Sequence, residues 1–124
     1  MYTRTTNTLI TMMMLAVILL VWTRASQAAL EITVRTYELD ASLVERWPLG
    51  DVGTIVFRKC DACEQIILAV DGTTQYKLEL SGSPIGRDEL LRIKSTLADP
   101  AAADVYISYR VADDIATRIV LDAD

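Results

Sequence analysis

The side chains best suited to chemistry in this chain are its two cysteines, Cys60 and Cys63, which are separated by two residues. A tight turn brings its first and fourth Cα atoms within about 7 Å. Disulfide bonds span roughly 4.4 to 6.8 Å between Cα atoms. The spacing therefore predicts a structural disulfide at a hairpin turn. Because the closed loop is so short, the bond would contribute only about 2 kcal/mol, and the apolar core would provide most of the stability.

Thiol–disulfide exchange is the alternative use of the same pair. Reactive Cys-x-x-Cys motifs generally place the attacking thiol at a helix N-terminus, where the helix dipole lowers its pKa. Here the residues after the second cysteine include two β-branched isoleucines and favour a strand. Arg58 and Lys59 would stabilise a thiolate, whereas Asp61 and Glu64 oppose it. We therefore expect a structural role and keep a redox role for Cys60 and Cys63 as the second hypothesis.

The chain contains no histidine, and this excludes several classes of site. A structural zinc site normally needs four Cys or His ligands, which this chain could supply only with a second copy or with recruited carboxylates. Glu64 stands where a c-type haem motif requires His, and Ser-His-Asp and Cys-His catalysis both lose their base. We expect no metal and no cofactor.

A small hydrolase that uses paired carboxylates is the third class considered. Asp113 and Asp114 are adjacent in the sequence, but they lie between two strand patterns. Aspartates in such a position are typical of solvated turns. The sequence therefore favours a protein that is not an enzyme.

Two aromatic residues, Trp47 and Tyr106, are candidates for binding a partner. Trp47 immediately precedes Pro48, and a tryptophan there either covers one end of the core or stands exposed as an anchor for a partner. Tyr106 lies on the strand face opposite the expected core. If both side chains were exposed and adjacent, they would form a binding surface.

Residues 1–28 have the pattern of a secretory signal peptide. Arg4 provides the charged start, an apolar run extends from Leu9 to Trp22, and Ser26 and Ala28 are the small residues needed for cleavage before Ala29. The apolar run would span about 21 Å as a helix, less than the roughly 30 Å of a bilayer core. Cleavage is therefore favoured over retention as a membrane anchor, and we expect no stable membrane insertion afterwards.

Residues 29–124 then form one small β-rich domain, since a chain of this length supports a single core. This part keeps all 17 acidic residues and loses two of the 12 basic ones, so its formal charge is 10 minus 17, or −7. A charge of this sign opposes binding to nucleic acid. Nucleic acid is therefore not an expected partner.

Alternating apolar and polar residues predict six strands, and a helical period predicts one helix. The expected strands cover residues 30–38, 54–59, 64–70, 75–80, 105–111 and 115–121, and the expected helix covers residues 87–97. Leu30, Ile32 and Val34 are expected to face the core from the first strand. Asp40 could cap a short helical turn that runs through Arg46, before the extended Trp47-Pro48 pair.

Asp71-Gly72 predicts a tight hairpin turn between the third and fourth strands. The third strand is apolar on both faces near its middle, which favours a central place in the sheet. The expected fold is α+β, with a mainly antiparallel sheet of about six strands and one helix between strands four and five. A small roll or a partly open barrel fits this order.

These features predict a small exported module, periplasmic or secreted, that is not an enzyme. We expect it to bind an envelope protein through an edge strand or the loop at Trp47. The alternative is a periplasmic thiol–disulfide redox protein that uses Cys60 and Cys63. The sequence identifies neither the ligand nor the oligomeric state.

Overall fold

The structure is a computed structural model that describes residues 33–123. The expected signal peptide at residues 1–28 and the start of the first expected strand lie outside these residues. Within residues 33–123, no helix is long and apolar enough to cross a membrane.

The described chain is mostly β-strand, with one α-helix and two short 3-10 helices. The strands are β1 (Val34–Asp40), β2 (Val44–Arg46), β3 (Gly53–Arg58), β4 (Gln65–Val70), β5 (Gln75–Lys77), β6 (Asp104–Arg110) and β7 (Ala116–Asp122). The helices are η2 (Ala41–Leu43), α2 (Arg87–Ser95) and η3 (Pro100–Ala102). The predicted α+β class is confirmed.

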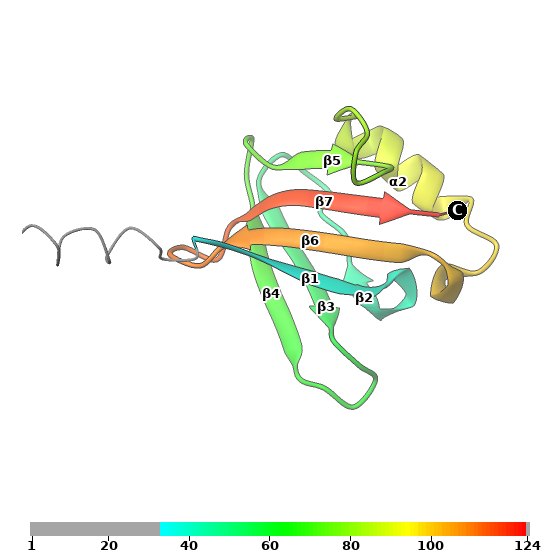
Figure 1. Cartoon of the computed structure of the whole chain (residues 1–124), viewed down its shortest axis with the longest axis horizontal. Helices are drawn as coiled ribbons and strands as arrows, with labels where there is room; N and C mark the ends of the chain where they lie inside the picture. The colour runs from blue at the N-terminus through cyan, green and yellow to red at the C-terminus, as the bar shows by residue number, and fades with distance from the viewer. Residues whose placement is uncertain (1–32, 124) are drawn as a thin grey trace, which may run out of the picture. The chain divides into compact units, whose positions relative to one another are not determined.

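The strands form two sheets, where the sequence predicted one. A four-stranded sheet has the order β1-β6-β7-β5, and a three-stranded sheet has the order β2-β3-β4. All pairings are antiparallel except that of β5 with β7. The strands of the two sheets cross steeply (Figure 1), and their facing side chains form the core. Core residues from both sheets are Leu39, Ile55, Phe57, Leu68, Val70, Val105, Ile107, Ile119 and Leu121.

The chain changes sheet for the first time at η2. Ala41 is buried there, and its N–H donates to the carbonyl of Ala103 at 2.8 Å. This contact holds the bend between β1 in one sheet and β2 in the other. The expected helical turn is therefore present but shorter, and the three-residue strand β2 was not predicted. Because β2 adds a strand, α2 follows the fifth strand and not the fourth.

The predicted hairpin at Asp71-Gly72 is wrong in its pairing. The turn exists, because the Thr74 N–H donates to the Asp71 carbonyl at 3.1 Å. Beyond it, however, β5 joins the other sheet and runs parallel to β7. The buried Thr74 hydroxyl donates to the Ala116 carbonyl at 2.7 Å. This bond directs the chain from the three-stranded sheet to the four-stranded sheet.

β4 lies at an edge of its sheet, so the predicted central position is also wrong. β3 is the central strand of that sheet. Ile67 on β4 is 60% exposed, because its side chain points to the outer face. Apolar residues on both faces of a strand indicated burial in the sequence, but only the face with Leu68 and Val70 is buried.

The first strand exposes the face that was expected to be buried. Val34 is 46% exposed, whereas Tyr37 and Leu39 pack against the core. Alternate residues point to opposite faces, so the large side chains of Tyr37 and Leu39 fix the register of β1 against β6. This correction concerns Val34 alone, since Leu30 and Ile32 precede the described residues.

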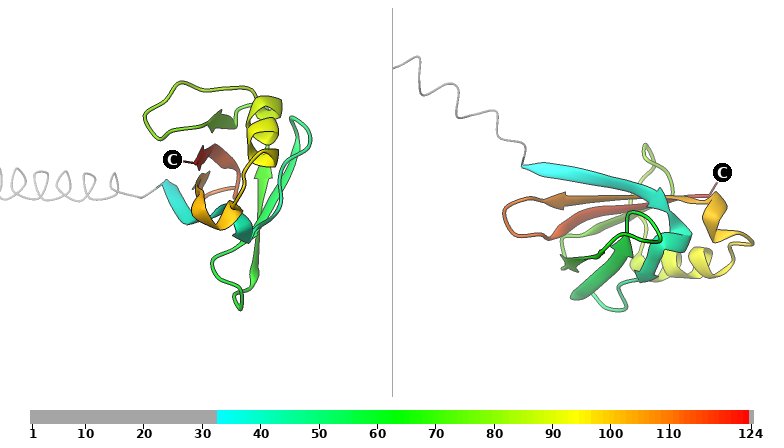
Figure 2. Two further views of the ribbon diagram at one scale, coloured as in Figure 1. Left: turned by 90° about the vertical axis from the view of Figure 1, so that its right-hand side faces the viewer. Right: turned by 90° about the horizontal axis from the view of Figure 1, so that it is seen from below.

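The β6–β7 hairpin and the helix agree well with the sequence pattern. Val105, Ile107 and Tyr109 are buried on β6, as the alternation predicts, whereas Val111 of the same alternating set is 42% exposed and lies beyond the strand. In β7, alternation with Ile119 and Leu121 predicts that Thr117 faces inward. The pairing shifts between Ser108 and Tyr109, however, and Ala116 faces inward instead. α2 buries Leu90 completely and lies beside β5, at the end of the domain away from the Cys60–Cys63 turn (Figure 2).

Candidate functional site

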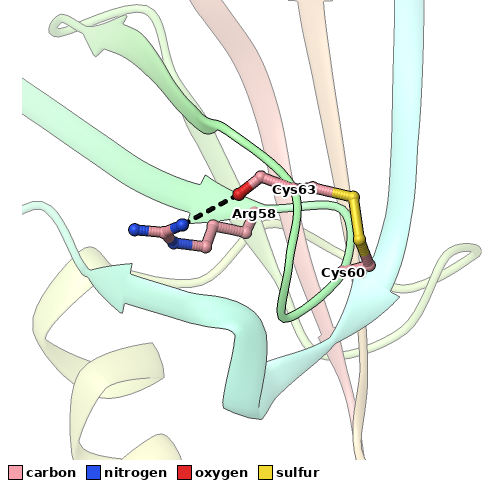
Figure 3. The surroundings of a disulfide bond; sticks show 3 residues. All are labelled: Arg58, Cys60 and Cys63. Carbon is pink, nitrogen blue, oxygen red and sulfur yellow. Dashed lines mark hydrogen bonds between the residues drawn. A yellow bond between two sulfur atoms is a disulfide. The ribbon is translucent and has the colours of Figure 1, made fainter.

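Cys60 and Cys63 form a disulfide bond in the turn between β3 and β4, as predicted (Figure 3). Their Cα atoms are 5.1 Å apart, and the Cys63 N–H donates to the Cys60 carbonyl at 3.1 Å. The four residues therefore make a closed β-turn that carries the bond. Cys60 is exposed and Cys63 is half-buried.

Arg58 fixes this turn to the rest of the three-stranded sheet. Its Nη1 donates to the Cys63 carbonyl at 2.8 Å (Figure 3). Its Nε donates to Glu45 on β2. The Gln65 amide donates to the second oxygen of the same carboxylate. The hydrogen bonds from Arg58 and Gln65 hold the pKa of Glu45 below its usual value. The Glu45 carboxylate thus links β2, β3 and β4 next to the disulfide turn.

An aromatic group supports the other side of the turn. The Lys59 ammonium lies 4.9 Å from the ring centre of Tyr37, and Tyr37 stacks on Tyr109 with ring centres 5.2 Å apart. Phe57 meets Tyr37 edge-on, also at 5.2 Å. The hydrogen bond between the two tyrosine hydroxyls, followed by burial, raises the pKa of Tyr37. The Lys59 ammonium therefore contacts the Tyr37 ring, although Lys59 is also the residue next to Cys60 in the sequence.

The geometry of the turn supports a structural disulfide more than a reactive one. Neither cysteine lies at a helix N-terminus, the position in which a dipole would lower the pKa of a thiol. Arg58 is paired with Glu45, so its charge is not free for a thiolate. Among residues 33–123, no group of three or more Cys, Asp and Glu side chains could hold a metal ion.

A second candidate is the loop of residues 47–52 between β2 and β3. Trp47 is only 6% exposed and Pro48 is fully buried, so the indole covers the core and is not the exposed anchor considered from the sequence. The two apolar residues that follow are turned outward: Leu49 is 85% exposed and Val52 is 79% exposed. The loop therefore presents two aliphatic side chains to solvent.

Contacts with α2 hold this loop. Arg87, at the start of the helix, forms an ion pair with Asp51 at 2.7 Å. The Lys94 ammonium lies 5.8 Å from the ring centre of Trp47. A Cβ atom at Gly50 would come within 3.3 Å of the Val52 carbonyl, so glycine suits this bend. Leu49 and Val52 thus project from a loop that is fixed at both ends.

The remaining residues singled out from the sequence are separate from this loop. Tyr106 is half-buried on the outer face of the four-stranded sheet, opposite the core. Since Trp47 is buried, the two aromatic residues do not form one exposed surface, and partner binding by either stays a prediction. Asp113 and Asp114 lie in the β6–β7 turn, where Asp113 accepts from Arg110 and from the Ile115 N–H.

Leu49 and Val52 were not selected from the sequence, although a signal was present. The two apolar residues stand among Pro48, Gly50 and Gly53, in a segment with no strand or helix period. Apolar side chains in such a loop have no regular element to bury them. The Trp47 indole drew attention to this loop, whose exposed apolar side chains are those of Leu49 and Val52.

Similarity to characterised proteins gives no further guidance. Comparisons with models of known families, with curated proteins and with solved structures found no match to this chain. Its function is therefore inferred from the disulfide turn and the loop of residues 47–52.

Proposed function

We propose that this chain is a small exported binding module, periplasmic or secreted and not an enzyme, that contacts a protein partner through the loop of residues 47–52. The observation that carries the proposal is the exposure of Leu49 and Val52 on a loop whose neighbours, Trp47 and Pro48, are buried. Binding to a rigid loop loses little conformational entropy. An apolar pair in that setting is well suited to fill a recess on another protein.

The charges around the loop indicate what kind of partner would fit. The side chains of Asp51 and Asp88, both paired with Arg87, are about nine-tenths exposed (90% and 86%). A partner with an apolar recess and a basic rim would complement this surface. The net negative charge of the chain disfavours binding to an anionic lipid surface, because like charges repel.

The test of partner binding compares two variants, one with a double and one with a single substitution, with the wild type in capture from an envelope fraction. A Leu49→Ser, Val52→Ser variant should lose the captured protein, because each serine removes a side chain that fills the recess. Ile67→Ser is the matched control, since Ile67 is also exposed but lies on β4. The captured protein is then purified and titrated directly, and its binding should weaken with added salt.

Two results would contradict partner binding at this loop. One is equal binding by the loop variant and the wild type; the other is equal loss in the Ile67→Ser control. Thermal unfolding of all three proteins accompanies the titration. Because the replaced side chains are exposed, their melting temperatures should agree, so a loss of binding cannot be attributed to unfolding.

Export is supported by the leader-like pattern of residues 1–28 and by the disulfide, which persists in oxidising compartments. Sequencing the N-terminus of the protein recovered from outside the cytosol tests it. The expected first residue is Ala29. Recovery of the protein only inside the cytosol, with Met1 retained, would rule export out.

A redox role remains the second candidate, because Cys60 is exposed and a reductant could reach it. If the disulfide is structural, a Cys60→Ser, Cys63→Ser variant should fold, lose about 2 kcal/mol of unfolding free energy and show the same absence of insulin reduction as the wild type. Urea unfolding and an insulin-reduction assay measure these outcomes. Turnover by the wild type that disappears in a Cys63→Ser variant would favour the redox role.

A further inference from the structure

The outer face of the four-stranded sheet carries a depression of about 440 Å³ that neither candidate site uses. Its lining comes from β1, β5, β6, β7 and the β4–β5 turn. Figure 1 shows these four strands side by side. The volume is within the range of small-molecule sites, which is roughly 300 to 1,000 Å³.

The strand register builds this depression from cross-strand neighbours. Arg118 on β7 pairs with Ser108 on β6 and with Gln75 on β5. Arg110 on β6 pairs with Val34 on β1. Cross-strand neighbours lie about 5 Å apart, so one row places an amide, a guanidinium and a hydroxyl within reach of a single ligand.

The charge of the lining is opposite to that of the chain. The chain has 17 acidic and 12 basic residues, yet the lining contains two arginines and no aspartate or glutamate. The other polar groups are the hydroxyls of Thr73, Ser108 and Thr117 and the Gln75 amide. Such a set of donors is suited to an oxyanion.

Most of the lining groups are already held in place. Asp113 accepts from Arg110 at two atoms, Nε at 3.2 Å and Nη2 at 2.9 Å, and so orients that guanidinium while offsetting part of its charge. The Ser108 hydroxyl, which is buried, lies 2.8 Å from the Thr36 hydroxyl. The Asp71 carboxylate accepts from the Thr73 N–H at 2.9 Å and from the Thr73 hydroxyl at 2.5 Å, and so holds Thr73 in place.

Arg118 differs from Arg110 in this respect. It forms no ion pair with any residue from 33 to 123, and it is half-buried between Ser108 and Gln75. A guanidinium carries five N–H donors in a planar fork that matches a carboxylate or a phosphate. Its charge is therefore available to a ligand, while Arg110 and the hydroxyls shape the surroundings.

We propose that this depression binds a small oxyanion, either a carboxylate or a phosphate, with Arg118 as the main contact. Two or three charge-assisted hydrogen bonds would give a Kd of about 1 mM. The site does not depend on the partner proposed for residues 47–52, because its lining shares no residue with that loop.

The test titrates the purified protein with glucuronate, with glucose and with inorganic phosphate, followed by NMR. Glucuronate or phosphate should shift the amide signals of Ser108, Arg118 and Gln75, whereas glucose, which has a similar ring without the carboxylate, should not. Binding of both anions, or of one alone, supports the proposal and identifies the preferred group. Equal binding of glucose, or no binding by either anion, would overturn it.

Substitutions then locate the contact. Arg118→Gln should weaken binding about tenfold or more, because it removes one charged hydrogen-bonding group, and Arg118→Lys should retain part of the affinity. Arg46→Gln is the control, since Arg46 is an exposed arginine on the three-stranded sheet. Unchanged affinity in Arg118→Gln, with its NMR spectrum showing a native fold, would also overturn the proposal.

Discussion

Glu45 has a larger structural role than an exposed glutamate usually has. Its two oxygens accept hydrogen bonds from Arg58 on β3 and Gln65 on β4, and Arg58 in turn donates to the carbonyl of Cys63. An ionised carboxylate accepts such hydrogen bonds more strongly than a protonated carboxyl group does. We therefore expect the stability of the disulfide turn to vary with the protonation state of Glu45.

This dependence predicts a specific response to pH. The pKa of Glu45 is lowered in the folded protein by Arg58 and then Gln65, so its contribution is complete above its usual value of about 4.5 and is lost as the pH falls through the lowered pKa. Glu45→Gln should therefore be less stable than the wild type at pH 7, and the difference should shrink as the pH falls below about 4.5.

Urea unfolding of both proteins from pH 7 to pH 3 measures this difference. Glu64→Gln is a suitable control, because Glu64 directly follows the disulfide turn but forms no ion pair with the described residues. Its urea midpoint should follow that of the wild type throughout. A constant gap between Glu45→Gln and the wild type over this range would show that the ionised carboxylate is not what holds the turn.

At the scale of elements, a buried hydroxyl joins the two sheets where β4 leads into β5. Thr74 donates to the Ala116 carbonyl at 2.7 Å, just where the chain leaves one sheet and joins the other. Valine has the shape of threonine without the hydroxyl, so Thr74→Val removes the bond to the Ala116 carbonyl and the bond that the hydroxyl accepts from the Asp71 N–H. The expected loss is roughly 1–3 kcal/mol of unfolding free energy, measured by urea unfolding.

A matched substitution separates the hydrogen bond from the change of residue type. Thr54→Val on β3 replaces a half-buried threonine for which no side-chain hydrogen bond is found among the described residues, and its urea midpoint should stay close to that of the wild type. Loss of stability in both variants, to the same extent, would mean that the crossing to β5 does not rest on Thr74.

The same crossing shows where sequence reasoning reaches its limit. Strand and helix periods depend on each segment's own residues, so α2 and the β6–β7 hairpin could be predicted. Pairing depends on which distant strand a segment meets, and nothing local in residues 75–80 indicates a parallel partner forty residues later. Asp71-Gly72 specified a turn correctly but not the strand that follows it.

The candidate sites likewise divide into one that local sequence specifies and others that depend on distant parts of the fold. Cys60 and Cys63 could be paired from spacing alone, because the geometry of a four-residue turn is local. The exposure of Leu49 and the burial of Trp47 depend on where α2 packs, which only the folded chain determines. The arginine depression could not be predicted, because it requires the register of β5 against β7.

At the scale of the whole molecule, one core joins the two sheets. Phe57 from the three-stranded sheet and Ile107 from the four-stranded sheet belong to the same cluster, and Leu90 of α2 is fully buried within it. Neither sheet has a second apolar layer of its own to cover this face. The described domain should therefore unfold in a single cooperative transition.

Leu90→Ala tests this cooperativity. Removing the buried side chain should cost about 2–5 kcal/mol of unfolding free energy, whereas Leu49→Ala, at an exposed position, should change stability little.

Two spectroscopic signals follow the unfolding of the Leu90→Ala variant. In a Trp22→Phe background, Trp47 is the remaining tryptophan and reports on the region beside β2, while far-UV circular dichroism reports on all strands. Both signals should shift to lower urea together, because Leu90 packs in the core that the sheets share. If Trp47 fluorescence changed at lower urea than the circular dichroism, the three-stranded sheet would be unfolding separately, and the single core would not be what joins the molecule.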